Sequence, residues 1–207
     1  MTRTIAVVSA GLSDPSSTRL LADLLAKAAT ETLGQRGVEV AVKVVELRPL
    51  AHALTDQLLT GFATGDLAAA EATVAGADAV IAVTPVFSAS YSGLFKTFFD
   101  VLERGSLDGT PVLIAATAGT ARHSLVLEHA LRPLFNHLHA VVVPTGVFAA
   151  SEDWGTAGAG TALAARVDRA AGELAALVAA REPATRLDAF ERDLAAMGDF
   201  EDLLRRP

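Results

Sequence analysis

The stretch from Thr84 to Lys96, TPVFSASYSGLFK, combines small hydroxyl side chains with two phenyl rings and one phenol ring. It follows a short apolar run at residues 79–83 that is rich in β-branched residues and predicts a buried strand. A helix is expected after it, with Ser92 as N-cap and Lys96 one helical turn before Asp100. Open α/β sheets bind ligands at such strand–loop–helix junctions. Amides, carbonyls and hydroxyls without a nucleophile and its base suit holding a flat heteroaromatic ring better than breaking a bond.

A second hydroxyl-rich segment, SAGLSDPSSTR from Ser9 to Arg19, precedes a predicted helix. Free amides and the helix dipole at a helix N-terminus favour an anion. The segment lacks the GxxxxGK[ST] motif, which argues against a triphosphate, whereas a phosphomonoester needs only amides and hydroxyls. Arg19 falls in the first helical turn, where the dipole disfavours a cation unless an anion lies nearby. A plain capping loop is the alternative interpretation.

The third segment, ATAGTARH from Ala116 to His123, again places small and hydroxyl residues between a strand and a helix. Gly119 would allow close approach of the backbone to a ligand. His123 is either a ring or phosphate contact or a simple cap. Each segment alone is compatible with a generic turn, and the argument for a ligand site comes from finding three of them behind parallel strands.

Apolar strands and amphipathic helices alternate along the chain. The strands that begin near residues 5, 79 and 112 are continuously apolar, as central parallel strands are. Residues 38–47 instead alternate valines with polar residues, which places this strand at a sheet edge. The pattern predicts an α/β, flavodoxin-like, doubly wound five-stranded parallel sheet of order 2-1-3-4-5; a Rossmann order is the main rival. The expected strands are 5–9, 38–47, 79–84, 112–117 and 140–144, and the expected helices are 17–33, 66–76, 92–104, 123–138 and 160–181.

The 207 residues suffice for one domain with a substantial core, predicted at residues 1–181 and followed by a charged C-terminal arm at 182–207. A net charge of −7 argues against nucleic acid as a partner. The absence of cysteine excludes thiolate chemistry, and no metal site is expected. No signal peptide is recognisable, and no apolar run approaches the roughly 20 residues of a membrane span. We therefore expect a cytoplasmic protein without a membrane or nucleic-acid partner.

The three segments together resemble the NADPH-dependent FMN reductase family, which has a flavodoxin-like fold. The resemblance covers roughly residues 4–150. Its most specific parts are the turn from Thr117 to His123 and the stretch from Pro85 to Lys96. The latter is similar to the family pattern P-x-Y-N-x-S-x-P-G-x-L-K, although Phe87-Ser88 replaces Tyr-Asn and Ser92 replaces Pro. The family's common arginine in the first loop is also displaced here, to Arg19. Residues 123–150 look like the subgroup that supplies reduced flavin to separate monooxygenases.

The resemblance implies a set of FMN contacts and no catalytic side chain, because hydride transfer from nicotinamide C4 to flavin N5 is chemistry of the cofactors. The FMN phosphate would be held by Ser9, Ser16, Ser17 and Thr18. The isoalloxazine would be lined by Pro85, Val86, Phe87, Ser88 and Ser90, and its pyrimidine side by Thr117, Ala118 and Gly119.

Pro133 falls inside the predicted helix 123–138, where it has no N–H to donate and its ring would clash with the preceding turn. A helix absorbs this by a kink or by a π-bulge, and π-bulges concentrate at functional sites. In the resembling subgroup, a Tyr or His at the place of His129 marks a π-helix at a subunit interface beside the flavin. A simple proline kink with a surface histidine is the alternative.

The expected function is an NAD(P)H:FMN oxidoreductase that uses FMN with NADPH or NADH, forms a homodimer or homotetramer, and supplies reduced flavin to a partner monooxygenase. One alternative retains FMN and reduces quinones, azo compounds or metal ions. Another is a flavodoxin-type electron carrier, and a third is a non-enzymatic flavin-binding module. Carriers are usually strongly acidic and hold FMN between aromatic rings, whereas these loops provide only Phe87 and Tyr91.

Overall fold

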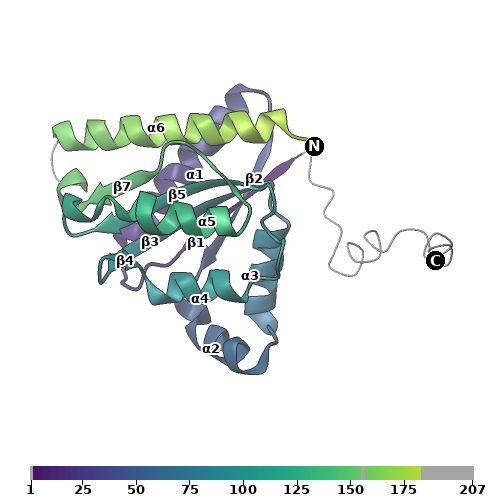
Figure 1. Cartoon of the computed structure of the whole chain (residues 1–207). Helices are drawn as coiled ribbons and strands as arrows, with labels where there is room; N and C mark the ends of the chain where they lie inside the picture. The colour runs from purple at the N-terminus through teal and green to yellow at the C-terminus, as the bar shows by residue number, and fades with distance from the viewer. Residues whose placement is uncertain (1, 155–156, 183–207) are drawn as a thin grey trace, which may run out of the picture.

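A central, mainly parallel sheet organises the computed structural model, which describes residues 2–154 and 157–182 (Figure 1). The seven strands follow the order β2-β1-β3-β5-β6, with β4 paired to β3 and β7 paired to β5. Only the β3–β4 pair is antiparallel. The strands are β1 (Arg3–Ser9), β2 (Val40–Glu46), β3 (Ala79–Phe87), β4 (Ser90–Tyr91), β5 (Pro111–Ala118), β6 (Val141–Val142) and β7 (Val147–Ala150).

Helices cover both faces of the sheet, with α1 and α6 on one face and α2 to α5 on the other (Figure 1). The side chains of β1 show why, because Ile5 and Val7 enter the core under α1 and α6 while Ala6 and Val8 enter the opposite core. The helices are α1 (Ser17–Gln35), α2 (Ala51–Thr60), α3 (Gly65–Ala75), α4 (Gly93–Val101), α5 (Arg132–His137) and α6 (Ala157–Ala180). Shorter turns are η1 (Arg48–Leu50), η2 (Ala121–His123), η3 (Leu127–Leu131) and η4 (Ser151–Trp154).

The predicted α/β class and parallel sheet are confirmed, but the prediction of five strands is wrong. The fifth strand, expected at 140–144, is divided into β6 and β7. Val143 N still donates to Val112 O at 2.9 Å, after which Pro144 offers no N–H and the pairing with β5 resumes only at Val147. The other strand that was not predicted, β4, consists of two residues that pair with the end of β3.

The edge position predicted for the alternating strand is confirmed, since among the strands that the structure describes β2 pairs only with β1. Its valine face is nevertheless only half covered, with Val42 and Val44 remaining 38% and 40% exposed. Lys43 between them is exposed as well. The partly covered face follows from the marginal position of β2, since the core under α1 and α6 is built mainly on β1, β3 and β5.

Apart from small shifts at the ends of α1, α3 and α6, the predicted helices differ from the structure in three places. Helix α2 was not predicted; it has no side-chain cap at its start and ends at Gly61, whose φ is 82°. Helix α4 ends at Val101 rather than at 104. The single helix expected at 123–138 is instead η2, η3 and α5 in succession.

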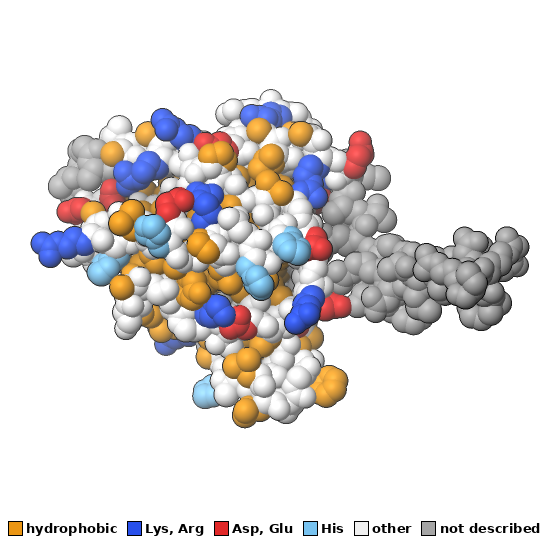
Figure 2. All heavy atoms as spheres, viewed as in Figure 1, with side chains coloured by type: hydrophobic (Ala, Val, Ile, Leu, Met, Phe, Trp, Pro, Cys, Tyr) orange, Lys and Arg blue, Asp and Glu red, His pale blue; other side chains and the backbone are white. Residues whose placement is uncertain are grey.

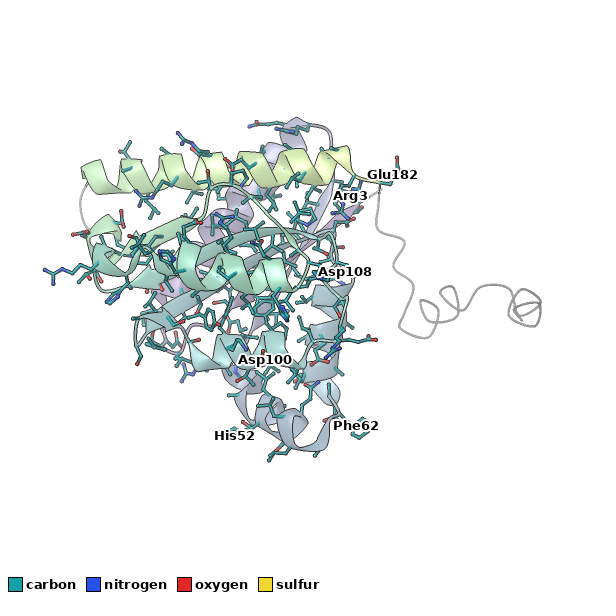
Figure 3. The ribbon with its side chains drawn as sticks, in the orientation of Figure 1. Arg3, His52, Phe62, Asp100, Asp108 and Glu182 are labelled. Carbon is teal, nitrogen blue, oxygen red and sulfur yellow. The ribbon has the colours of Figure 1, made fainter. Side chains whose placement is uncertain are left out.

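Helix α2 forms the tip of the molecule farthest from α6, and His52 near its start and Phe62 just beyond its end lie on opposite sides of this tip (Figure 3). Of the predicted arm at 182–207, all but Glu182 lies outside the described residues. Within the described part of the chain, no helix has the length and apolar content to cross a membrane.

Candidate functional site

The first hydroxyl-rich segment forms a tight loop between β1 and α1. Ser16 is the N-cap of α1, and its hydroxyl accepts a hydrogen bond from Arg19 N at 3.2 Å. A Cβ at Gly11 would overlap Ser16 Oγ and lie 3.3 Å from Thr18 Cβ, so this close turn requires glycine. Arg19 N is thus capped by Ser16, and the amides before it in the first turn of α1 have no helical acceptor, as at any helix N-terminus where an anion can bind.

The second segment is a β-hairpin rather than the polar loop expected at residues 85–91. Strand β3 continues to Phe87, which pairs with Ser90, and the turn between them places Ser88 and Ala89 at φ 48° and 65°. Two consecutive positive φ values are typical of a type I′ turn, whose twist matches that of paired strands. The hairpin thus projects beyond the sheet as ordered structure.

The base of the hairpin is fixed by hydroxyl hydrogen bonds. Ser92 N donates to Thr84 Oγ1 at 3.0 Å, and Ser92 Oγ accepts from Phe95 N at 3.2 Å. Ser92 is therefore the N-cap of α4, as predicted. Below it, the rings of Phe95 and Phe99 lie 4.7 Å apart and pack against Phe135 of α5. This aromatic packing supports the hairpin from the core side.

The third segment is joined to the first by a buried hydroxyl pair. Thr18 Oγ1 and Thr117 Oγ1 lie 2.8 Å apart, and both residues are only 3% exposed. Thr117 also lies opposite Pro85 in the register of β3 and β5. The carboxyl ends of β1, β3 and β5 consequently bring all three segments to one edge of the sheet.

A pocket of about 420 Å³ lies where the three segments meet. Most of the predicted site residues line it: Ser17, Thr18, Pro85, Val86, Phe87, Thr117, Ala118 and Gly119. Ser9 and Ser16 instead line an adjoining polar pocket of about 390 Å³, and Ser90 lines a groove between α4 and α5. Ser88 is exposed at the hairpin turn.

Sequence reasoning missed three residues that line the main pocket, namely Leu12, Ser13 and Ser151. Leu12 and Ser13 lie inside the segment already singled out, and their contact with the pocket depends on how the loop folds. Ser151 directly follows β7. Because the fifth strand was expected to end at 144, nothing placed Ser151 at a carboxyl strand end.

Arg19 is held by two carboxylates. Its Nε donates to Asp23 at 2.8 Å and its Nη1 to Glu46, at the end of β2. The hydrogen bonds to Asp23 and then Glu46 raise the pKa of Arg19 above its ordinary value, so the guanidinium remains charged. The expected anion near this cation is therefore supplied at least in part by the protein.

The π-helix proposed around His129 is confirmed, since η3 is a π-helix over Leu127–Leu131 and Pro133 occupies the first turn of the following α5. Arg132 stabilises this junction by donating to Glu128 at 2.7 Å and 2.9 Å and to the carbonyls of Val143 and Pro144. The hydrogen bonds from Arg132 lower the pKa of Glu128.

Beside η3 runs a groove of about 590 Å³ between α4 and α5. Its walls include Tyr91, Phe99 and Leu134, and its rim carries Lys96, paired with Asp100. Several histidine side chains lie across the face that contains α5 (Figure 2).

The site offers amides, hydroxyls and an apolar wall, with no nucleophile and base in hydrogen-bond contact. In the described residues, no group of three or more His, Asp or Glu side chains is placed to bind a metal. The pocket volume falls within the roughly 300–1,000 Å³ of small-molecule sites. The arrangement suits a ligand with a flat ring and one anionic end.

Comparison with known proteins assigns the family. Residues 3–155 match the model of the family described as NADPH-dependent FMN reductase. The chain belongs to this family. An FMN reductase (NADPH) of Pseudomonas aeruginosa is 39% identical over 150 residues, which are 72% of this chain and 78% of the relative. The NADH-dependent FMN reductase SfnE of Pseudomonas putida is 37% identical over 172 residues, 81% of this chain and 88% of the relative.

Solved structures share the fold of this chain. An oxidoreductase from Corynebacterium diphtheriae is 49% identical, with a TM-score of 0.84 over 87% of this chain and 99% of the other. A flavodoxin, WrbA-like protein from Agrobacterium tumefaciens is 17% identical, with a TM-score of 0.59 over 87% of this chain and all of the other, 100%. The second likeness concerns the fold alone, which is flavodoxin-like.

The residues present fit FMN. Gly11, whose Cβ would collide with Ser16, keeps the loop close around the free amides where a phosphate would sit. Pro85, Val86 and Ala118 provide an apolar wall for a flat ring. The exposed ring of Phe87, 47% accessible, lies at the same pocket.

Proposed function

We propose that this protein is an NAD(P)H-dependent FMN reductase whose site is the pocket at the carboxyl ends of β1, β3 and β5. The observation that carries the proposal is the convergence of three hydroxyl-bearing segments on one pocket in a chain of this family. FMN, when bound, accepts a hydride from the reduced nicotinamide. The protein contributes binding, orientation and exclusion of water.

The proposed contacts divide the pocket by chemistry. The phosphate lies at the N-terminus of α1, where amides and the hydroxyls of Ser9, Ser16, Ser17 and Thr18 donate to it. The isoalloxazine lies against Pro85, Val86 and Phe87, which line the pocket, and reaches Ser88 and Ser90 of the same hairpin, which lie outside it. Its pyrimidine side contacts Thr117, Ala118 and Gly119. There it can accept hydrogen bonds from backbone N–H groups and donate to backbone carbonyls.

The function is tested by following oxidation of NADPH and of NADH by the purified protein, with and without added FMN. Oxidation that saturates with FMN, by protein that is colourless as purified, supports a reductase that treats FMN as a substrate. Yellow protein that needs a quinone, azo compound or metal ion as acceptor would instead show a retained flavin. Protein that binds FMN but oxidises neither nicotinamide would be an electron carrier or a binding module.

We further propose that two or four copies associate through the groove between α4 and α5. The π-helix η3 borders this groove, and apolar side chains line it. Replacing His129, which lines the groove, by alanine is expected to weaken assembly and flavin turnover together, measured by light scattering and by FMN reduction. Unchanged assembly and turnover would contradict this part of the proposal, and His52→Ala on α2 serves as the control.

Two further parts of the proposal follow the family resemblance. Residues 1–181 form the FMN-binding domain, and residues 182–207 are an accessory arm. Reduced FMN passes to a separate flavin-dependent monooxygenase. The transfer is tested by coupling the protein to a monooxygenase that accepts free reduced flavin and measuring product formed per NADPH oxidised.

A further inference from the structure

The guanidinium of Arg19 lies at the edge of the proposed phosphate site but hydrogen-bonds elsewhere. It shares the adjoining 390 Å³ pocket with Ser9, Gly11 and the N-cap Ser16. Its Nε nevertheless donates to Asp23, on the same helix, and its Nη1 donates to Glu46, on β2. The cation closest in sequence to the phosphate loop is thus engaged by carboxylates.

Glu46 is well placed to fix this arrangement. It is the last residue of β2 and lines the same pocket as Arg19, together with the charged side chains of Asp14 and Arg48. Asp23, one helical turn along α1, and Glu46 are about equally exposed, at 50% and 49% of their side chains, so both are surface partners of Arg19. Glu46 comes from a different element, so it determines the direction in which the far end of the guanidinium points.

We propose that Glu46 is a positioning residue that limits how strongly the protein recognises the flavin phosphate, by keeping Arg19 hydrogen-bonded to β2. This inference rests on the proposed function. Hydrogen bonds between a guanidinium and a phosphate are among the strongest in proteins. Because Arg19 hydrogen-bonds to carboxylates, the phosphate is held mainly by amides and hydroxyls. The ratio of the riboflavin to the FMN dissociation constant is therefore smaller than it would be if Arg19 bound the phosphate. Moderate affinity suits a flavin that must leave after reduction.

The test compares dissociation constants for FMN and for riboflavin, measured by quenching of flavin fluorescence with the full-length chain. Glu46→Gln is expected to tighten FMN about tenfold and to leave riboflavin unchanged, because only FMN carries the phosphate. Glu46→Asp, which retains the charge, is expected to bind FMN much as the unaltered protein does. Glu31→Gln, which removes a carboxylate paired with Lys27 on the exposed side of α1, is the matched control and should change neither constant.

A double variant separates the role of Arg19 from a general effect of charge. If Glu46 acts through Arg19, Glu46→Gln gains nothing in an Arg19→Gln background. An equal gain in both backgrounds would overturn the inference, since it would reflect only the loss of a negative charge near the phosphate. Failure of the unaltered protein to bind FMN would overturn the proposed function itself. FMN binding with an unchanged FMN-to-riboflavin ratio in Glu46→Gln would overturn this inference alone.

Discussion

Ser88 and Ala89 adopt backbone angles that L-residues with a Cβ seldom take, at the turn of a hairpin that borders the proposed flavin site. Asn-Gly is the usual solution for such a turn, because glycine has no Cβ to clash at positive φ. The protein accepts this strain at the tip of the hairpin, where Ser88 and Ala89 are both exposed. Strained residues of this kind concentrate at ligand sites and persist only where the surroundings hold them.

Ala89→Gly is accordingly expected to stabilise the protein by about 1 kcal/mol, since it relieves the left-handed strain at φ 65°. The measurement is the free energy of unfolding from urea denaturation. Ala176→Gly, at an exposed position inside α6, is the matched control and should destabilise the protein by about 1 kcal/mol. Destabilisation by both substitutions would contradict the proposed strain.

At the same scale, the sequence predicted the residue types of the site better than their geometry. Thr18 and Thr117 were both identified as ligand contacts, but the hydroxyl hydrogen bond between them joins segments 99 positions apart and has no local signal. The hydrogen bond from Arg19 to Glu46 was not predicted either, because it also joins distant parts of the chain without a local signal. Ser151 was missed because its role depends on where β7 ends.

At the scale of elements, proline residues explain where the predicted boundaries held and where they did not. Pro133 interrupts a helix, and the π-helix expected as one of two solutions is present. Pro144 interrupts a strand, and this effect was not anticipated. The continuously apolar strands β1, β3 and β5 were located from composition alone, because burial on both faces leaves a clear pattern. Helix α2 has no side-chain cap at its N-terminus, and its glycine C-cap, Gly61, was not enough to predict it.

Two polar side chains between α2 and α3 have buried oxygen atoms that accept no hydrogen bond. Gln57 Oε1 and Glu71 Oε1 are both buried without a hydrogen-bond partner. Burial raises the pKa of Glu71 above its ordinary value, although a hydrogen bond from Gln57 acts in the opposite direction. The charged form of Glu71 is therefore disfavoured in the folded protein.

The stability contributed by this group is present below the unfolded-state pKa of Glu71 and is lost as pH rises through its higher folded-state pKa. Glu71→Gln is thus expected to raise the melting temperature at about pH 7, which is well above the usual range of carboxyl pKa values. In acid it is expected to have little effect. The melting temperature across pH checks this. Asp56→Asn, an exposed substitution on α2, is the control. An equal effect of Glu71→Gln at all pH values would exclude titration as the cause.

On the scale of the whole molecule, the two ends of the described chain meet at the edge of the sheet opposite the pocket. Arg3, at the start of β1, donates to Asp78 at 3.0 Å and to the carbonyl of Arg181, just beyond α6. Arg181 in turn donates to the carbonyl of Gly109. Figure 3 places Arg3 beside Glu182, where α6 ends. These contacts join the last helix to the first strand and to the loop before β5.

Two truncations therefore distinguish the arm from the domain. A chain that ends after Glu182 is expected to keep its melting temperature and its FMN reduction. A chain that ends after Ala180 also lacks Arg181, and it is expected to melt several degrees lower because a part-buried hydrogen bond of Arg3 is lost. Thermal unfolding followed by circular dichroism gives the comparison. Loss of activity on removal of the arm alone would show that the arm contributes to the site.

The half-covered edge strand β2 affects how the protein interacts with other chains in a concentrated solution. In the described part of the chain no strand pairs with its outer edge, so a second chain in an extended conformation can pair there, and burial of Val42 and Val44 would favour such pairing. Lys43 stands between them, and joining edge to edge would strip water from its ammonium group. Lys43 thus opposes fibrillar aggregation through the edge of β2.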